Sequence, residues 1–171
     1  MNNLFLIGYR GTGKTAVARL LAARWRWVAI DADALLEERH GQTIAEIFAS
    51  EGEAGFRDKE AKLLEELCRE QQRVIATGGG IILRPANRQR LRESGRCVWL
   101  TADARTLWER IQADAATRRR RPDLTVGGLA EVEQLLQARE PLYRACADWT
   151  VDTRDRTAEQ VAEIIVEKLQ I

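Results

Sequence analysis

Residues 8–15 read GYRGTGKT and match the pattern G-x-x-x-x-G-K-[ST] at every fixed position. This stretch follows the apolar run LFLI at residues 4–7 and precedes AVARLLA at residues 16–22, which has helical character. Where a strand leads into such a loop and a helix follows it, backbone N–H groups and the positive end of the helix cradle phosphate groups. The chain is therefore predicted to contain a phosphate-binding loop between a strand and a helix, and to bind a nucleotide there.

Each part of this loop has a predicted role. Glycines let the backbone wrap closely around phosphate oxygens, Lys14 reaches the β- and γ-phosphates, and the Thr15 hydroxyl binds Mg²⁺. Many small-molecule kinases carry a second hydroxyl residue next, where this chain has Ala16; its backbone N–H remains, so we expect a modest loss of affinity at most. The predicted nucleotide-binding residues of the loop are Gly11, Thr12, Gly13, Lys14, Thr15 and Ala16.

Four further apolar runs alternate with helix-period segments along the chain: WVAI, RVIAT, CVWL and WTVD, at residues 27–30, 73–77, 97–100 and 149–152. This rhythm predicts repeated βα units with a buried parallel sheet. Between the runs WVAI and RVIAT, apolar residues at helical spacing predict two helices joined near Gly52–Gly55. Residues 116–128, ATRRRRPDLTVGG, interrupt the helical pattern and predict a long charged loop.

Composition narrows the classes of function. A length of 171 residues predicts one domain with a substantial core. The 27 Lys and Arg against 26 Asp and Glu give a net charge of +1, which argues against a nucleic-acid or membrane partner. The three cysteines, Cys68, Cys97 and Cys146, form no metal or disulfide pattern and are expected to be reduced core thiols. With no long apolar run or signal segment, we expect a cytoplasmic protein. We also expect it to be a monomer.

The second apolar run leads into IDADALLEE, which places Asp31 and Asp33 at alternate positions past the carboxyl end of a strand. Ligands of open α/β sheets bind at that edge. Alternate residues of an extended segment share a face, so one carboxylate can serve a metal through water and the other an acceptor hydroxyl. The alternative is that one of them only caps the helix that begins near Ala34.

Two further features lie downstream. In GFRDKE, Arg57 and Glu60 are three residues apart on a helix and can pair, although such a pair is often a solvated surface feature. After the third apolar run, ATGGG places Gly78–Gly80 at another strand end. Three glycines permit close backbone approach to a ligand, and a tight strand-to-helix turn is the structural alternative.

Six segments, GYRGTGKT, DAD, GFRDKE, TGGG, RRP and AREPLY, occur in the order and approximate spacing of the shikimate kinase family. The chain resembles that family from end to end. The resemblance implies a three-layer α/β/α P-loop kinase fold with a five-stranded parallel sheet, in one domain spanning residues 1–171. It also implies a helical substrate-binding insertion at about residues 32–62 and a mobile lid at about residues 113–127. The implied reaction transfers the γ-phosphoryl group of ATP to the 3-hydroxyl of shikimate, in aromatic amino-acid synthesis.

The resemblance also implies roles for acceptor-side residues. Arg57 and Arg139 are expected to bind the shikimate carboxylate, because a guanidinium can hold a carboxylate through two parallel hydrogen bonds. Asp33 is expected to orient the attacking hydroxyl and is placed to accept its proton. The N–H groups of Gly79 and Gly80 complete the pocket, and Glu60 supports Arg57.

On the nucleotide side, the lid arginine of the family directly precedes a proline, which selects Arg121 as a catalytic and phosphate-binding residue. The family usually has R-P-L-L there, and this chain departs from it at Asp123. Arg118, Arg119 and Arg120 can contact phosphates, steer anions or keep the loop solvated. Arg110 resembles an arginine near the adenine but can equally be a surface residue, and either Arg154 or Arg156 is expected to flank the base.

Two other functions remain open from the sequence. Another metabolite kinase on the same fold, such as a gluconate kinase, differs in its acceptor. A catalytically silent module that binds nucleotide would lack Lys14, Asp33 or Arg121, and all three are present. The tryptophans Trp99, Trp108 and Trp149 lie in strand-like or helical segments and are expected to pack rather than to bind a ligand.

Overall fold

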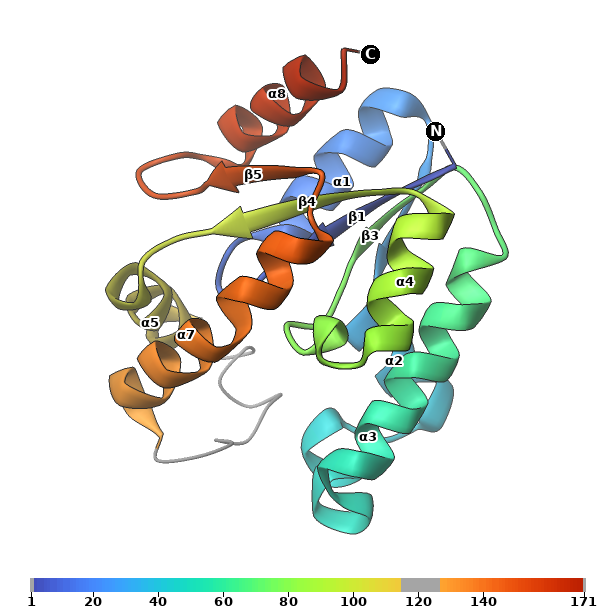
Figure 1. The fold of residues 1–171 in the computed structure, drawn as a ribbon, viewed down its shortest axis with the longest axis vertical. Helices are drawn as coiled ribbons and strands as arrows, with labels where there is room; N and C mark the ends of the chain where they lie inside the picture. The colour runs from blue at the N-terminus through green and yellow to red at the C-terminus, as the bar shows by residue number, and fades with distance from the viewer. Residues whose placement is uncertain (1, 115–126, 171) are drawn as a thin grey trace.

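The computed structural model describes residues 2–114 and 127–170. Its centre is a parallel sheet of five strands in the order β2-β3-β1-β4-β5 (Figure 1). The strands are β1 (Asn3–Ile7), β2 (Val28–Asp31), β3 (Arg73–Ala76), β4 (Arg96–Thr101) and β5 (Trp149–Asp152). Each coincides within one or two residues with an apolar run of the sequence, so the predicted parallel sheet is confirmed.

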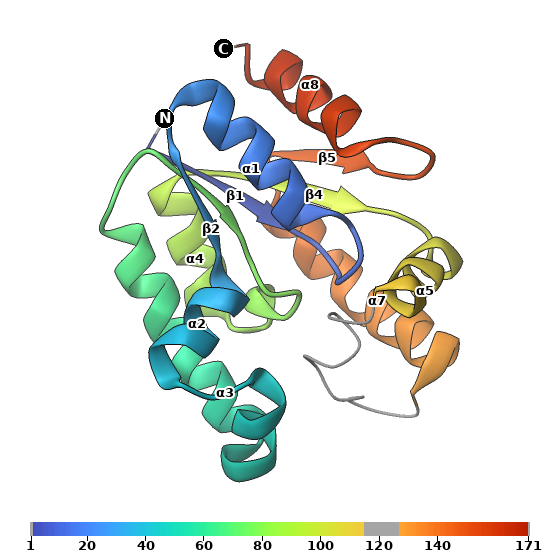
Figure 2. The ribbon, with the colours of Figure 1, turned by 180° about the vertical axis from the view of Figure 1, so that it is seen from behind.

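Helices cover both faces of the sheet, as Figures 1 and 2 show from opposite sides. One face carries α1 (Lys14–Trp25) and α8 (Ala158–Leu169), and the other carries α3 (Ile44–Cys68), α4 (Pro85–Ser94) and α7 (Gly128–Cys146). Successive side chains of β1 alternate between these layers: Leu4 and Leu6 pack with α1 and α8, and Phe5 and Ile7 with the other helices. A strand that buries both faces reads as a continuous apolar run, as LFLI does.

The shorter elements gather beyond the carboxyl ends of the strands. They are α2 (Ala32–His40), η1 (Ile81–Leu83) and α5 (Ala104–Ala113). A small cluster that includes Tyr9 and Leu107 joins α5 and α7 to the end of β1. The phosphate loop follows β1 at the middle of the sheet, so segments from β2, β3 and β4 surround it.

The predicted junction between two helices lies inside α3. Gly52 has φ 70° and ψ −178°, which interrupts the helical backbone, so residues on its two sides form separate helical segments. A positive φ is easily adopted by glycine alone. A capping box of Thr43 and Glu46 starts the first segment, and Phe48 packs against Phe56 across the kink with ring centroids 4.8 Å apart.

Packing accounts for the tryptophans and cysteines. Trp99 stacks on Tyr143 with ring centroids 5.7 Å apart, while Trp108 and Trp149 pack against apolar clusters. Cys97 and Cys146 are buried and Cys68 is half-buried, and all three are free thiols. A hydrogen bond with Cys146 and burial raise the pKa of the Cys97 thiol, which favours its neutral form. Across residues 2–114 and 127–170, no helix has the length and apolar character needed to cross a membrane.

Candidate active site

The phosphate loop turns sharply between β1 and α1 because its glycines adopt backbone angles that other residues avoid. Gly11 and Gly13 both have φ of 85°. Gly8 has φ 141°, and a Cβ atom there would lie 2.2 Å from the carbonyl oxygen of Leu100. Strand β4 therefore approaches the loop too closely for any side chain at residue 8. The loop delivers the chain directly into the N-terminus of α1, where unpaired N–H groups favour an anion.

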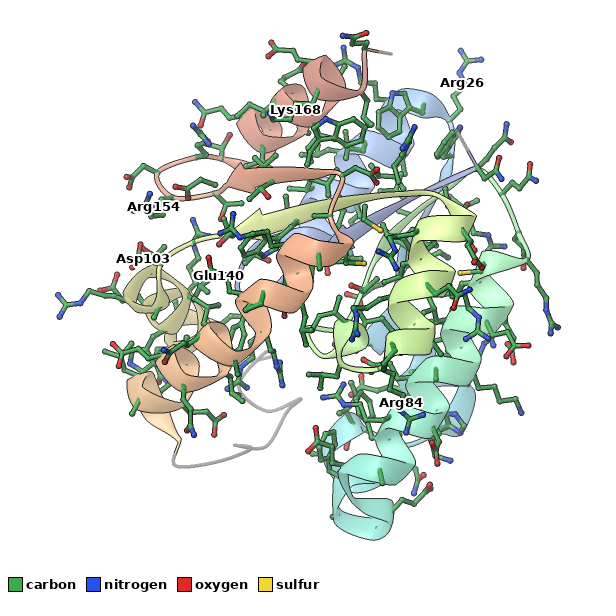
Figure 3. All side chains as sticks on the ribbon, in the orientation of Figure 1. Arg26, Arg84, Asp103, Glu140, Arg154 and Lys168 are labelled. Carbon is green, nitrogen blue, oxygen red and sulfur yellow. The ribbon has the colours of Figure 1, made fainter. Side chains whose placement is uncertain are left out.

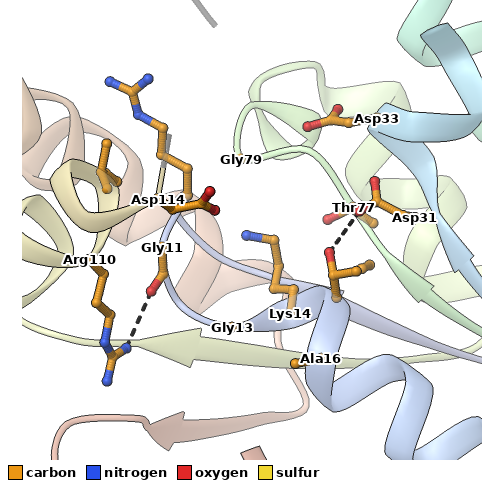
Figure 4. A pocket seen from close by; sticks show the side chains of 14 residues that line it. Gly11, Gly13, Lys14, Ala16, Asp31, Asp33, Thr77, Gly79, Arg110 and Asp114 are labelled. Carbon is orange, nitrogen blue, oxygen red and sulfur yellow. Dashed lines mark hydrogen bonds between the residues drawn. The ribbon is translucent and has the colours of Figure 1, made fainter. Parts of the chain in front are cut away.

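Lys14 is the first residue of α1, and its side chain folds back over the loop. Its Nζ donates hydrogen bonds of 2.8 Å to the carbonyl oxygens of both Gly8 and Tyr9. The residue also lines a cavity of about 350 Å³ outside the carboxyl ends of the strands (Figure 4). The ammonium group is thus held at the loop, beside the space that a phosphate chain would occupy.

Thr15 and Asp31 meet at the same cavity from α1 and the end of β2. The Thr15 hydroxyl donates to Oδ2 of Asp31 at 2.7 Å, while Oδ1 accepts the N–H of Ala34 at 3.0 Å. Asp31 therefore caps α2, as the structural alternative held, and at the same time orients an oxygen toward Thr15.

This hydroxyl and carboxylate suit Mg²⁺, a cation that takes oxygen ligands and keeps several waters. No group of three or more His, Cys, Asp or Glu side chains in the described part of the chain could hold a metal by itself. A magnesium ion at Thr15 and Asp31 would therefore need nucleotide phosphates and water to complete its shell, which is the usual arrangement at phosphoryl-transfer sites.

Asp33 lies in the first turn of α2 and lines the cavity together with Asp31 and Lys14. In Figure 4 the two aspartates lie on one side of Lys14 and Arg110 on the other. Thr77 and Gly79, from the segment after β3, also line this space. The structure thus brings the sequence-predicted residues of two strand ends and the phosphate loop to one cavity.

Arg57 and Glu60 form a buried ion pair in α3, so the interpretation as a solvated surface pair is wrong. Both side chains are 6% exposed, and Nη1 of Arg57 lies 2.8 Å from Oε2 of Glu60. Nη2 lies 3.3 Å from Glu53, and the guanidinium carbon lies 5.0 Å from the centroid of the Phe56 ring. These contacts hold the guanidinium in one orientation.

The segment after β3, which holds the three glycines and continues into η1, is held in place by hydrogen bonds to three of its carbonyl groups. The Tyr143 hydroxyl donates to the carbonyl oxygen of Gly79. Asn87 Nδ2 donates to the Ile81 oxygen at 3.1 Å, and Arg88 donates to the next carbonyl at 2.7 Å. Sequence reasoning missed these residues as supports of the site. Asn87 and Arg88 carry no signal beyond polarity, whereas Tyr143 lies within the AREPLY segment.

At Gly80 the close backbone approach is to the side chain of Arg57, whereas approach to a ligand stays a prediction. A Cβ atom built on Gly80 would lie 2.3–2.4 Å from the Arg57 guanidinium, so the backbone packs directly against that cation. At Gly79 the nearest atoms to such a Cβ are 3.5 Å away, an ordinary contact distance. The two glycines therefore differ: Gly80 needs the absence of a side chain in this arrangement, and Gly79 has room for a methyl group.

Arg139 is buried on α7, which covers the same face of the sheet as α3. Its guanidinium lies 5.8 Å from the centroid of the Tyr9 ring, and that of Arg10 lies 5.9 Å from the same ring. Burial raises the pKa of Tyr9, and the two cations oppose that shift. Arg10 also lines the cavity, and sequence reasoning missed it because the loop pattern allows any residue there.

Arg110, on α5, bridges the phosphate loop and the segment after β5. It donates to the carbonyl oxygen of Gly11 at 3.3 Å, and to the hydroxyl and carbonyl oxygens of Thr153 at 2.9 and 2.7 Å. These contacts, together with its place on the cavity wall, show that Arg110 is not simply a surface residue.

Arg154 and Arg156 remain exposed on the loop after β5. Arg154 binds Asp152 at 2.8 Å and lies 3.9 Å from Asp103, and Figure 3 shows Arg154 at the outer edge of the molecule near Asp103. The hydrogen bond from Arg154 lowers the pKa of Asp152. Neither arginine belongs to the 14 described residues that line the cavity, so their adenine-side role stays a prediction. The predicted lid residues Arg118–Arg121 and Asp123 lie outside the described residues.

Comparison with known proteins gives a consistent family. A family model described as shikimate kinase matches residues 10–170. The shikimate kinase of Rhodopirellula baltica is 48% identical over 160 residues, covering 93% of this chain and 86% of that protein. The shikimate kinase of Symbiobacterium thermophilum is 42% identical, covering 98% of this chain and 96% of that protein.

A solved structure agrees with the sequence comparisons. The structure of shikimate kinase from Acinetobacter baumannii in complex with shikimate superposes with a TM-score of 0.93 at 35% identity, covering 99% of this chain and 93% of that one. The match extends over the sheet and the helices on both of its faces. The chain therefore belongs to the shikimate kinase family of ATP-dependent enzymes.

Proposed function

We propose that this chain is a Mg²⁺-dependent shikimate kinase, which transfers the γ-phosphoryl group of ATP to the 3-hydroxyl of shikimate. The products are shikimate 3-phosphate and ADP, and the reaction belongs to chorismate synthesis. The observation that carries the proposal is the single cavity lined by Lys14, Thr15, Asp31 and Asp33, with Gly79 on its wall. Phosphate-binding and acceptor-side residues share that space, as transfer between two bound substrates requires.

On the nucleotide side, Lys14 neutralises the β- and γ-phosphates, and Arg121 adds a second cation to the transferring group. Thr15 would hold Mg²⁺ directly, and Asp31 would hold it through water. When bound, the ion neutralises charge on the phosphate oxygens. Phosphoryl transfer asks the protein mainly for alignment and positive charge, because the transition state spreads negative charge over the oxygens of the transferring group. Closure of the lid would exclude water that competes as acceptor.

On the acceptor side, Arg57 and Arg139 bind the shikimate carboxylate, and Glu60 holds Arg57 in place. The N–H groups of Gly79 and Gly80 contact the ring substituents. Asp33 accepts a hydrogen bond from the 3-hydroxyl and orients it toward the phosphoryl group. This assignment is supported by the burial of both arginines, since a buried cation is a strong site for an anionic ligand.

Gly80→Ala is expected to raise KM for shikimate by about 10- to 150-fold, while the affinity for ATP stays near normal. The new methyl group would displace the Arg57 guanidinium, and a lost hydrogen bond to a charged ligand corresponds to about 1.5–3 kcal/mol. Gly79→Ala is the matched comparison, and steady-state kinetics should show a smaller rise in KM. Equal effects of the two substitutions would contradict the contact between Gly80 and Arg57.

Glu60→Gln is expected to lower the free energy of unfolding by about 3 kcal/mol, because it removes the carboxylate partner of a buried cation. The control is Glu53→Gln: this partner is 52% exposed, so its loss should cost less than about 1 kcal/mol. Urea denaturation of both variants makes the comparison. Similar midpoints for the two would show that Glu60 does not anchor Arg57.

The proposal has further parts that concern the whole molecule. We propose that the chain acts as a monomer in the cytoplasm, as one domain, without a nucleic-acid or membrane partner. The near balance of charge supports the absence of a polyanionic partner. Light scattering at working concentration checks the oligomeric state, and a dimer at micromolar concentration would contradict it.

ADP release tests the proposed function. The purified chain is supplied with ATP and Mg²⁺, together with shikimate, with gluconate or with no acceptor. Release that depends on shikimate is the expected result. Release with gluconate alone would keep the kinase and replace the acceptor, whereas ATP binding without acceptor-dependent release would favour a silent nucleotide-binding module.

A further inference from the structure

Arg10 occupies a position of the phosphate loop at which the pattern G-x-x-x-x-G-K-[ST] requires no particular residue. Its side chain nevertheless lines the cavity beside Gly11, Gly13 and Lys14. The acceptor-side arginines Arg57 and Arg139 are not among the described residues of that wall. Arg10 thus shares the cavity wall with the phosphate-loop residues, and its guanidinium lies beside the Tyr9 ring that Arg139 also contacts. Lys14 alone accounts for the charge that the pattern demands.

A buried carboxylate holds this guanidinium. Nη2 of Arg10 lies 3.5 Å from Oε1 of Glu131, with side chains 17% and 1% exposed respectively. Glu131 lies in the first turn of α7, and its Oε2 accepts the N–H of Gly127 at 3.3 Å. A carboxylate this deeply buried is costly without a cation nearby. The pair therefore restricts where the Arg10 guanidinium can point.

The charged side chains of the cavity wall indicate what Arg10 can bind. Three cations and three carboxylates belong to its described lining: Arg10, Lys14, Arg110, Asp31, Asp33 and Asp114. Arg110 uses N–H donors on the carbonyl oxygens of Gly11 and Thr153. Arg10 also carries five N–H donors, and its contact with Glu131 cannot use all of them. Fixed donors next to a developing negative charge stabilise it without further reorganisation.

We propose that Arg10 is a binding residue for the γ-phosphoryl group and that Glu131 is its positioning residue. This inference rests on the proposed function, because it assigns a second cation of the loop to the group that is transferred. Since ADP lacks the γ-phosphoryl group, Arg10 must discriminate between ATP and ADP. A purely structural tie between the phosphate loop and α7 would affect both nucleotides alike.

The test is a titration of Arg10→Met with Mg²⁺ and either ADP or the β,γ-imido analogue of ATP, in the absence of any acceptor. The substitution should weaken binding of the ATP analogue about tenfold and binding of ADP less than about twofold, as expected for one charge-assisted hydrogen bond. Arg105→Met, at an exposed arginine of α5, is the control for loss of one positive charge and should leave the ratio unchanged. An unchanged ratio in Arg10→Met would overturn the proposal.

Two further variants separate position from charge. Glu131→Gln should reduce the discrimination in the same direction, and the double variant should lose no more of it than Arg10→Met, because both act through one guanidinium. Arg10→Lys keeps the charge and should retain part of the discrimination, which provides a readout should Arg10→Met fold poorly. Additive losses would remove Glu131 from the role. Because no acceptor is present, these outcomes are distinct from a failure of shikimate-dependent ADP release.

Discussion

Lys14→Met is expected to lower kcat about 10²–10³-fold, the largest effect of any substitution on the nucleotide side. The ammonium group is held by two carbonyl oxygens of the loop at 2.8 Å, so it already lies where the phosphate chain must pass. Removing one preorganised donor at a developing negative charge has an effect of this size in other enzymes. KM for shikimate should change little, because the residue faces the nucleotide.

Lys168→Met is the matched control. Lys168 is exposed near the end of α8, which packs on the face of the sheet that α1 also covers (Figure 3), and its loss removes the same charge. Thermal unfolding of both variants checks that the loop hydrogen bonds of Lys14 are not needed for folding. A folded Lys14→Met protein with wild-type kcat would refute the role assigned to the phosphate loop.

Asp33→Asn is expected to lower kcat about 10²–10⁴-fold, the range attributed to a positioned proton acceptor. The amide keeps the size of the side chain and can still hydrogen-bond a hydroxyl, so KM for shikimate should rise less than about tenfold. The position of Asp33 in the first turn of α2, on the wall shared with Lys14, supports this split between turnover and binding.

The control for this variant is Asp58→Asn, because Asp58 is 73% exposed and its pair with Arg84 lies at the surface. Its kinetics should match those of the unmodified chain. A rise in KM alone for Asp33→Asn, with kcat unchanged, would leave Asp33 as a binding residue and remove it from the chemical step.

The sequence was sufficient wherever local pattern decides structure. Buried strands appear as apolar runs, and Gly52 marks the break in α3 because few other residues adopt its positive φ. Asp31 and Asp33 could be placed at one ligand edge because parallel strands end together. Spacing also paired Arg57 with Glu60, but it left their burial open, since burial depends on what packs over α3.

The remaining parts of the site depend on contacts between distant segments. Tyr143 reaches the carbonyl oxygen of Gly79 across 64 residues of sequence, and Arg110 reaches that of Gly11 across 99. No periodicity or spacing encodes such contacts, because they arise when α7 packs on the sheet and α5 packs beyond the strand ends. For the same reason the loop pattern assigns no role to Arg10, because its partner Glu131 comes from the distant helix α7.

The most direct measurement is the ³¹P NMR spectrum of a reaction containing the chain, ATP, Mg²⁺ and shikimate. Our account predicts the signals of ADP together with one phosphate ester, whose phosphorus couples to the proton on C3 of the shikimate ring. Orthophosphate in place of the ester would show that water, rather than shikimate, accepts the phosphoryl group. An ester on another hydroxyl would contradict the orientation that we assign to Asp33.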